Sequence, residues 1–389
     1  MRKRLSSLML LLGLLVVGVP AQARAQAPAP LWNAAQVERL IQWLDFARND
    51  ALHVAAVEVP KLRAAQERGD AAELDQAANA AAVKLLDGYY QGCCDASLRS
   101  GWHIAGDRPK GDPATLVADA VISGAIDPLF IAATPRHPYY RALRNAYSVE
   151  VDPIRKATLA ANMDRWRWMP RDLGRRYLLV NAASFEATLW EDGATKGRWT
   201  VVVGKTKSPT PIFSTRVTGV VLNPWWEIPA SIAAESVAAI VAKNSAAAAR
   251  RGYVYENGRY RQRPGPNNSL GRMKLVMPNS YNVYLHDTPA QALFGQEVRA
   301  YSHGCVRVGD ALDLVTTLLS RSGWDRARVD GVVASGATRT VTLDEPVPVY
   351  IAYFTAEPDD EGAMRFFPDV YKRDRAALSP PGSGEACGV

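Results

Sequence analysis

A cysteine and two histidines near residue 300 could together form a nucleophilic site. Cys305 lies in the run Tyr301–Val308 (YSHGCVRV), His303 precedes it by two residues, and fifteen residues separate His286 from Ser302. A cysteine attacks a carbonyl carbon as a thiolate, and only about 3% of a free thiol is ionised at pH 7. A neighbouring imidazole can accept the thiol proton. The residue types and their spacing therefore predict acyl transfer with Cys305 as the nucleophile.

Two features around the cysteine favour the same chemistry. Gly304 permits a tight backbone turn that can direct N–H groups at an oxyanion. Cys305 is predicted to lie at the start of a helix over 309–319. We expect the positive end of that helix to favour the thiolate of Cys305.

The strands that must position these residues lie between residues 177 and 355. Alternating patterns and β-branched residues predict strands over 177–180, 185–190, 199–203, 217–222, 273–277, 282–286 and 338–355. Turn residues that connect the early strands of this series favour a mostly antiparallel sheet. Together with the helices that precede it, this sheet indicates the α+β class.

The strand pattern is interrupted between residues 231 and 272. An alanine-rich stretch predicts a helix from Ser231 to about Arg250, and a polar stretch that contains glycine and proline follows it. Long connections in compact domains are usually functional lids or disordered segments. Because this connection is rich in aromatic and basic residues, we predict an inserted capping subdomain that acts as a lid.

The helical pattern over residues 31–150 predicts a scaffold domain. The strand pattern over residues 155–375 predicts the domain that contains Cys305. Asn33 is a good N-cap residue, and apolar residues recur after it at helical spacing: Val37, Leu40, Ile41 and Leu44. A second helix is predicted over 71–89. The tail over 376–389 is small and polar, and we expect it to be disordered.

The first 25 residues predict a secretory signal peptide. Three basic residues precede an apolar run from Leu8 to Val19, and small residues follow at the sites around Ala23. The run is shorter than the roughly 20 residues that a membrane-spanning helix needs. We therefore expect export to the periplasm, with an uncleaved signal anchor as the alternative and as the only membrane attachment.

Charge and cysteine content limit the remaining function classes. The formal net charge of +7 falls to +3 when the signal peptide is removed, and this is too small to indicate nucleic-acid binding. Cys93, Cys94 and Cys387 are disulfide candidates in an oxidising compartment. The sequence leaves their pairing open, and buried reduced cysteines are the alternative.

The run around Cys305 resembles the signature of the L,D-transpeptidase (YkuD-like) catalytic domain. That signature is a histidine followed after some fifteen residues by Ser/Thr-His-Gly-Cys, and Arg307 keeps its Cys-x-Arg form here. The chain also resembles the YcbB-like branch, which has a helical scaffold and an inserted cap. The similarity covers most of the chain after Arg165 and includes Trp166-Arg167-Trp168, Val180-Asn181, Gly204-Lys205, Thr210-Pro211, Asn223-Pro224, Ile228-Pro229, Pro264-Gly265-Pro266, Leu270-Gly271-Arg272, 350–355 and 369–374.

This resemblance implies a peptidoglycan L,D-transpeptidase that uses neither cofactor nor metal. Cys305 would attack the meso-diaminopimelate carbonyl of a tetrapeptide stem, D-alanine would leave, and an amine would resolve the acyl-enzyme. Transfer to a second stem peptide would form a 3-3 cross-link. Because carbapenems acylate family members, we expect this protein to be a carbapenem target with a role in cell-wall biogenesis and cell shape.

The resemblance also implies roles for individual residues. His286 would be the general base, His303 and Arg307 would shape the site, and backbone N–H groups around Gly304 and Cys305 would form the oxyanion hole. Five further residues are predicted to bind substrate: Tyr284, Ser302, Trp226, Arg263 and Arg272. For Trp226 the alternative is a packing role, and for the two arginines it is a solvated surface.

Several alternatives stay open at this point. Water as the acceptor would make the protein an L,D-carboxypeptidase, a free D-amino acid would give exchange, and an inactive site would leave a non-catalytic wall-binding protein. Zinc bound by Cys305, His286 and His303 would lack a fourth ligand nearby. Papain-like peptidases place the cysteine before the histidine, and sortases place their histidine much farther upstream. The preferred acceptor (diaminopimelate, a free D-amino acid, protein lysine or water), the oligomeric state and the regulation are not predicted.

Overall fold

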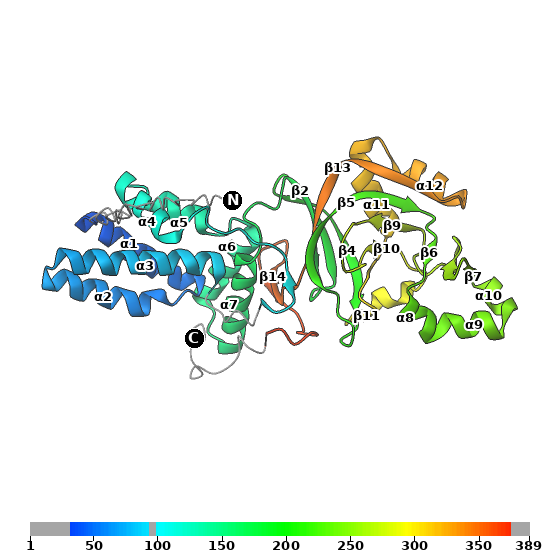
Figure 1. The fold of residues 1–389 in the computed structure, drawn as a ribbon, viewed down its shortest axis with the longest axis horizontal. Coiled ribbons are helices and arrows are strands. Elements are labelled where there is room, and N and C mark those ends of the chain that lie inside the picture. The colour runs from blue at the N-terminus through cyan, green and yellow to red at the C-terminus, as the bar shows by residue number, and fades with distance from the viewer. Residues whose placement is uncertain (1–31, 93–98, 375–389) are drawn as a thin grey trace, which may run out of the picture.

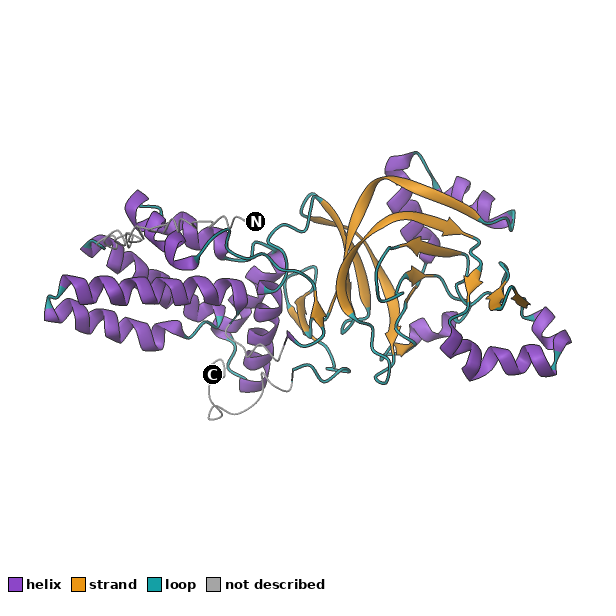
Figure 2. Cartoon of the chain, viewed as in Figure 1, coloured by secondary structure: helices purple, strands orange, loops and turns teal. Residues whose placement is uncertain are grey.

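The computed structural model describes residues 32–92 and 99–374. Figure 1 shows a group of helices at one end, a large sheet beside them and a small subdomain at the other end. Figure 2 separates the helical part from the strand-rich part. The predicted signal peptide, the predicted tail and the cysteines Cys93, Cys94 and Cys387 lie outside the described residues. No helix within the described ranges is long and apolar enough to cross a membrane.

The N-terminal part is helical, as predicted. Asn33 caps α1: its side chain accepts from the Gln36 backbone, and the Gln36 side chain accepts from the Asn33 backbone in return. The predicted apolar stripe of α1 is buried against its neighbours. The helices are α1 (Ala34–Ala47), α2 (Val54–Arg68), α3 (Ala71–Gln91), α4 (Pro113–Ser123), α5 (Ile126–Ala133) and α6 (Pro138–Val149).

Helix α7 (Pro153–Arg167) joins the helical part to the sheet. It begins where the sequence predicts a junction, because Asp152 caps it and Pro153 fits its first turn. Its C-terminal half is buried. Trp166 stacks on His137 from the helical part at 4.1 Å and on Phe354 from the sheet side at 4.7 Å, measured between ring centroids.

The main sheet has ten strands in the order β1-β5-β13-β2-β3-β4-β12-β10-β9, with β11 paired to β4. A further pairing of β5 with β9 closes the sheet on itself. Its strands are β1 (Trp102–His103), β2 (Arg176–Asn181), β3 (Glu186–Glu191), β4 (Ala194–Gly204), β5 (Ile212–Leu222), β9 (Met273–Val276), β10 (Leu285–His286), β11 (Ala300–Ser302), β12 (Val306–Val308) and β13 (Arg339–Ala352). The pairings include parallel ones such as β10 with β12, although antiparallel ones predominate.

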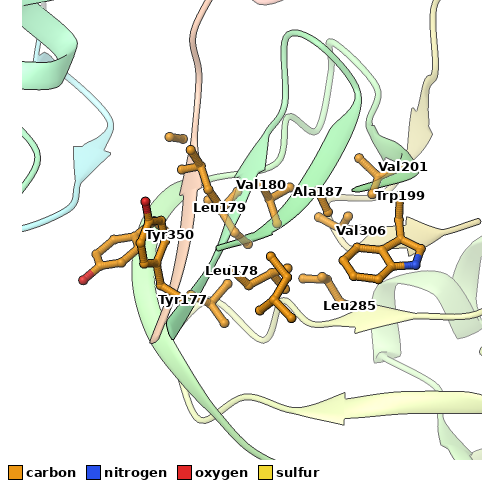
Figure 3. Close-up of a cluster of buried hydrophobic side chains, with 14 of the residues drawn as sticks. Tyr177, Leu178, Leu179, Val180, Ala187, Trp199, Val201, Leu285, Val306 and Tyr350 are labelled. Carbon is orange, nitrogen blue, oxygen red and sulfur yellow. The ribbon is translucent and has the colours of Figure 1, made fainter. Parts of the chain in front are cut away.

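One face of the central strands forms the apolar core. Figure 3 shows Leu178 from β2, Leu285 from β10 and Val306 from β12 pointing into this core. All three are fully buried. Helix α11 (Ala311–Leu319) adds further buried residues, and α12 (Arg326–Ala334), β14 (Ala356–Pro358) and β15 (Met364–Phe366) complete the described chain.

The inserted segment forms a small subdomain, here called the cap. Its sheet has the order β6-β8-β7, with β6 (Trp226–Glu227), β7 (Tyr253–Glu256) and β8 (Arg259–Gln262). The cap sheet therefore includes residues that precede the predicted insertion start at 231. The predicted single helix is instead interrupted, as α8 (Ala230–Ile232), a π-helical turn (233–237), α9 (Ala238–Lys243) and α10 (Ser245–Arg250), and it breaks at Asn244, which caps α10.

The prediction that Cys305 lies at a helix start is wrong. The cysteine leads directly into β12, and helix α11 begins only at Ala311. A helix dipole acts mainly within the first turn. The α11 dipole therefore does not account for ionisation of this thiol.

Candidate active site

Two neighbouring parallel strands position Cys305 and His286. β10 and β12 pair with Leu285 opposite Val306 and with His286 opposite Arg307. Leu285 and Val306 point into the apolar core (Figure 3). Because successive side chains of a strand alternate between faces, His286, Arg307 and Cys305 share the opposite face. The sequence prediction that these three residues lie together is therefore consistent with the strand register.

The imidazole of His286 has a defined proton position. Its Nδ1 lies 2.5 Å from the carbonyl oxygen of Asp287, and because a carbonyl oxygen can only accept, Nδ1 donates. Nε2 is then the unprotonated nitrogen of the neutral ring. The side chain is buried, and burial lowers the pKa of His286 to about 4. At neutral pH this imidazole is therefore uncharged and can accept a proton at Nε2.

The thiol of Cys305 is protonated at rest. Burial raises its pKa, while the backbone N–H of Tyr284 and the positive charges of Lys274 and Arg307 act in the opposite direction. Its Sγ lies 3.8 Å from the carbonyl oxygen of Asn282. Within the described residues no hydrogen bond joins the thiol to an imidazole. Catalytic hydrogen bonds often tighten only in the complex with substrate, so this arrangement is compatible with the predicted roles of the two residues.

Ser302 and Gly304 shape the turn that presents the cysteine. The buried Ser302 hydroxyl donates to the Cys305 carbonyl at 2.5 Å and accepts from the Gly304 N–H at 3.0 Å. Gly304 has a φ of 119°, which residues with a Cβ rarely adopt. The Gly304 N–H is thus occupied, whereas the Cys305 N–H makes no hydrogen bond in the described part of the chain. Of the two backbone N–H groups predicted to form the oxyanion hole, that of Cys305 is therefore the one without a partner among the described residues.

Arg272 and Asp287 hold the segment that contains the base. The Arg272 Nε lies 3.0 Å from Asp287 Oδ2, and its backbone N–H donates to the same oxygen at 2.8 Å. The Asp287 carboxylate is buried. Arg272, predicted to bind substrate, therefore already has a partner and fixes the residue whose carbonyl orients His286.

His303 faces the cap rather than the thiol. Its Nε2 lies 3.1 Å from Glu235 of the π-helical turn and 3.2 Å from Lys205 of the loop after β4. The ring is exposed. Its position fits a role in shaping the site and connects the catalytic turn to the cap.

The other predicted substrate residues lie in different surroundings. Tyr284 is half-buried against the apolar cluster of the cap, and its ring centroid lies 5.7 Å from that of His286. Trp226 is 9% exposed and belongs to the same cluster, which fits the packing alternative. Arg263 is exposed, which fits the alternative of a solvated surface.

Comparison with known protein families agrees with this geometry. Residues 175–351 match the L,D-transpeptidase catalytic domain, and residues 24–146 match the Scaffold domain. The chain contains an L,D-transpeptidase catalytic domain preceded by a Scaffold domain.

Individual relatives are similar over part of the chain. A protein of Haemophilus influenzae with the name "Putative L,D-transpeptidase" is 32% identical over 238 residues, which cover 56% of this chain and 48% of the relative. This chain thus spans about half the length of that curated relative.

Solved L,D-transpeptidase structures are more distant. L,D-transpeptidase 3 of Mycobacterium tuberculosis, in complex with a faropenem-derived adduct, is 15% identical over 46% of this chain and 60% of that chain, with a TM-score of 0.25. A mutant of the Enterococcus faecium L,D-transpeptidase is 14% identical over 45% and 50% of the two chains, with a TM-score of 0.22.

The structure adds site residues that sequence reasoning missed. Lys274 on β9 pairs in register with His286, Asn282 contacts the thiol, and Glu235 contacts His303. Lys274 lies between the buried residues Met273 and Leu275, and this alternation is the sequence signal that could have indicated Lys274. Within the described ranges, no group of three or more His, Cys, Asp or Glu side chains could hold a metal ion.

Proposed function

We propose that this protein is a peptidoglycan L,D-transpeptidase in which Cys305 is the nucleophile and His286 the general base. The match to the L,D-transpeptidase catalytic domain supports the reaction class, and the neighbouring strand positions of the two side chains support their roles. The donor is a tetrapeptide stem with meso-diaminopimelate at its third position. The acceptor is the side-chain amine of a second stem, so the product is a 3-3 cross-link.

The chemistry has two halves. The thiol proton moves to Nε2 of His286 as Sγ attacks the diaminopimelate carbonyl, and the Cys305 N–H donates to the oxygen that becomes negative. The C–N bond to D-alanine then breaks, a thioester remains, and His286 returns its proton to the leaving amine. In the second half the acceptor amine attacks the thioester, gives a proton to His286, and releases the thiol.

One observation supports this assignment above the others. The hydrogen bond from His286 Nδ1 to the Asp287 carbonyl leaves Nε2 as the proton acceptor. A neutral, oriented imidazole on the strand next to the cysteine is what a cysteine acyltransferase needs.

We also propose a periplasmic location, with stem peptides as the partners. The predicted signal peptide over residues 1–25 supports this, as does the location of peptidoglycan outside the cytoplasmic membrane. An uncleaved anchor would keep the same active site on the outer side of that membrane.

Intact-mass spectrometry after incubation with a carbapenem tests the nucleophile. We expect one adduct on the unmodified protein, none on Cys305→Ala, and an unchanged adduct on His103→Gln, which alters an exposed histidine on β1. With a tetrapeptide, the unmodified protein should release D-alanine and form cross-linked dimers. An adduct on Cys305→Ala, or no adduct and no D-alanine release by the unmodified protein, would contradict the proposal.

A further inference from the structure

Two positively charged side chains flank the imidazole of His286. Lys274 on β9 is the register partner of His286 on β10, and His286 is in turn the partner of Arg307 on β12. Direct partners in a sheet point to the same face. The three side chains therefore form one row on the face that also presents Cys305.

Neither cation of this row has a carboxylate partner in the described part of the chain. The Lys274 ammonium lies 4.2 Å from the centre of the Tyr284 ring. Glu227, the carboxylate whose charge acts on Lys274, forms its ion pair with Arg261 at 2.7 Å instead. In the described part of the chain, Arg307 forms no ion pair and no side-chain hydrogen bond. The charge that acts on the pKa of Arg307 is that of the Cys305 thiolate.

Burial makes this lack of partners costly. Lys274 and Arg307 are both half-buried, and burial lowers the pKa of each. Removing an unpaired charge from water is unfavourable unless an opposite charge compensates it. The thiolate of Cys305 supplies one negative charge during the reaction. Two cations and one thiolate leave a positive charge that a substrate anion can neutralise.

We propose that Lys274 and Arg307 bind the C-terminal carboxylate of the donor stem, the carboxylate of the amino acid that leaves. The inference rests on the proposed function and makes Lys274 a specificity-determining residue of that reaction. The leaving amine must receive its proton from Nε2 of His286, and in an amino acid the carboxylate carbon is only two bonds from the amine nitrogen. A leaving group held at the imidazole therefore places its carboxylate beside the row of cations.

A different role would leave a different signature. If Lys274 acted only on the thiolate or on the oxyanion, its loss would slow acylation by every donor equally. Recognition of the leaving carboxylate changes the rate only for donors that have this group.

The experiment compares a tetrapeptide donor with its C-terminal amide. The unmodified full chain should release D-alanine from the acid with a kcat/KM about tenfold or more above that for release of D-alaninamide from the amide, as expected for loss of a charge-assisted contact. Lys274→Gln should lower the ratio of kcat/KM for the acid to that for the amide by about tenfold, whereas the loss of its positive charge near the thiol acts on both donors alike. Lys274→Arg should restore most of the preference. Lys196→Gln, which changes an exposed lysine on β4, is the matched control and should behave as the unmodified protein.

The outcomes separate this inference from the proposed function. Turnover of both donors at equal rates by the unmodified protein, or an equal loss on both donors in Lys274→Gln, would overturn the carboxylate site and keep the transpeptidase assignment. No turnover of either donor by the unmodified protein would overturn both. Should Lys274→Gln not fold, the acid-to-amide ratio of the unmodified protein and of Lys274→Arg still decides.

Discussion

Burial acts in opposite directions on the two reacting groups of the site. It raises the pKa of the Cys305 thiol and lowers the pKa of the His286 imidazole to about 4. Both effects favour the neutral forms, so the resting pair is a thiol and an imidazole. A thiolate–imidazolium pair formed before substrate binding is therefore not expected here. In the proposed reaction, His286 contributes when the thiol proton is transferred, during attack on the carbonyl.

Replacing His286 with glutamine tests this order of events. Acylation of Cys305 by a carbapenem should slow by about 10²- to 10⁴-fold, the usual contribution of a general base. The pH profile of iodoacetamide alkylation at Cys305 should stay where it is, because an imidazole with a pKa of about 4 is uncharged above about pH 5. Mass spectrometry of the peptide that contains Cys305 measures both rates.

The position of the alkylation profile is part of the same test. Because burial raises the thiol pKa, alkylation of the unmodified protein should reach its half-maximal rate above the pH of about 8.5 that is typical of a free thiol. His103→Gln is the control. A midpoint well below that pH, which moves upward by a unit or more in His286→Gln, would mean that an ion pair exists at rest.

At the level of elements, two kinds of contact attach the cap. One is the contact of Glu235 with His303 at 3.1 Å, whose side chains are 58% and 42% exposed. Exposed pairs of this kind contribute about 0–1 kcal/mol. The other is the apolar cluster of Trp226, Ile228 and Leu270 with their neighbours, against which Tyr284 of the site packs. Truncating a buried leucine costs about 2–5 kcal/mol, so the cluster is the stronger attachment.

Leu270→Ala and Glu235→Gln should therefore differ in their effects on the protease accessibility of the cap and on KM. The alanine variant should make residues 231–272 more accessible to protease and raise the KM for the stem peptide several-fold, while the catalytic domain keeps its cooperative unfolding. Glu235→Gln should change both quantities by less than about twofold. Limited proteolysis and steady-state kinetics on the two variants decide, and equal effects would show that the contact of Glu235 with His303 matters as much as the packing.

Local patterns predicted much of this architecture. The Asn33 cap and the strand propensity of the β-branched residues in β4 and β5 depend on residues close in sequence. Closure of the sheet by β5 with β9 depends on pairing between distant segments, which no local pattern encodes. β12 has only three residues, too few for a recognisable alternation, so the cysteine was assigned to a helix start instead.

The same distinction applies to the site. The spacing of His286 and Cys305 predicted their relation because it lies within one stretch of sequence. Lys274 is recognised as a site residue only from its register with His286, and sequence alone does not define this register. Arg272 was assigned to substrate because it lies on the predicted lid, and its ion pair with the buried Asp287, fifteen residues away, is not encoded in any local pattern.

At the level of the whole molecule, an aromatic cluster joins the helical part to the sheet. His137 precedes α6, stacks on Trp166 of α7, and forms a hydrogen bond between its Nε2 and the Tyr177 hydroxyl of β2 at 2.9 Å. Its Nδ1 accepts from the Tyr139 N–H, so the ring is neutral. Burial lowers the pKa of His137 to about 3. The junction therefore depends on an imidazole that stays uncharged.

This dependence has a definite sign as the pH falls. The unfolded chain takes up a proton at His137 near pH 6.5, whereas the folded chain resists it until about pH 3, so stability is lost across that window. His286, with a pKa of about 4, acts in the same direction. Glu357 acts in the opposite direction, because burial raises its pKa to about 8, and the cost of keeping it neutral disappears as the pH falls toward 4.5. The contribution of His137 must therefore be isolated by substitution.

Urea unfolding of the unmodified protein and of His137→Gln at pH 7 and at pH 4 makes that separation. A glutamine does not titrate, so the variant should lose about 3 kcal/mol less unfolding free energy than the unmodified protein on going from pH 7 to pH 4. The variant will be less stable at both pH values because it loses the stack on Trp166. The test therefore compares the change in unfolding free energy between pH 7 and pH 4, not the free energies themselves. His103→Gln, at an exposed site on β1, should follow the unmodified protein. Parallel losses in all three proteins would show that protonation of His137 does not govern the acid stability of the junction between helices and sheet.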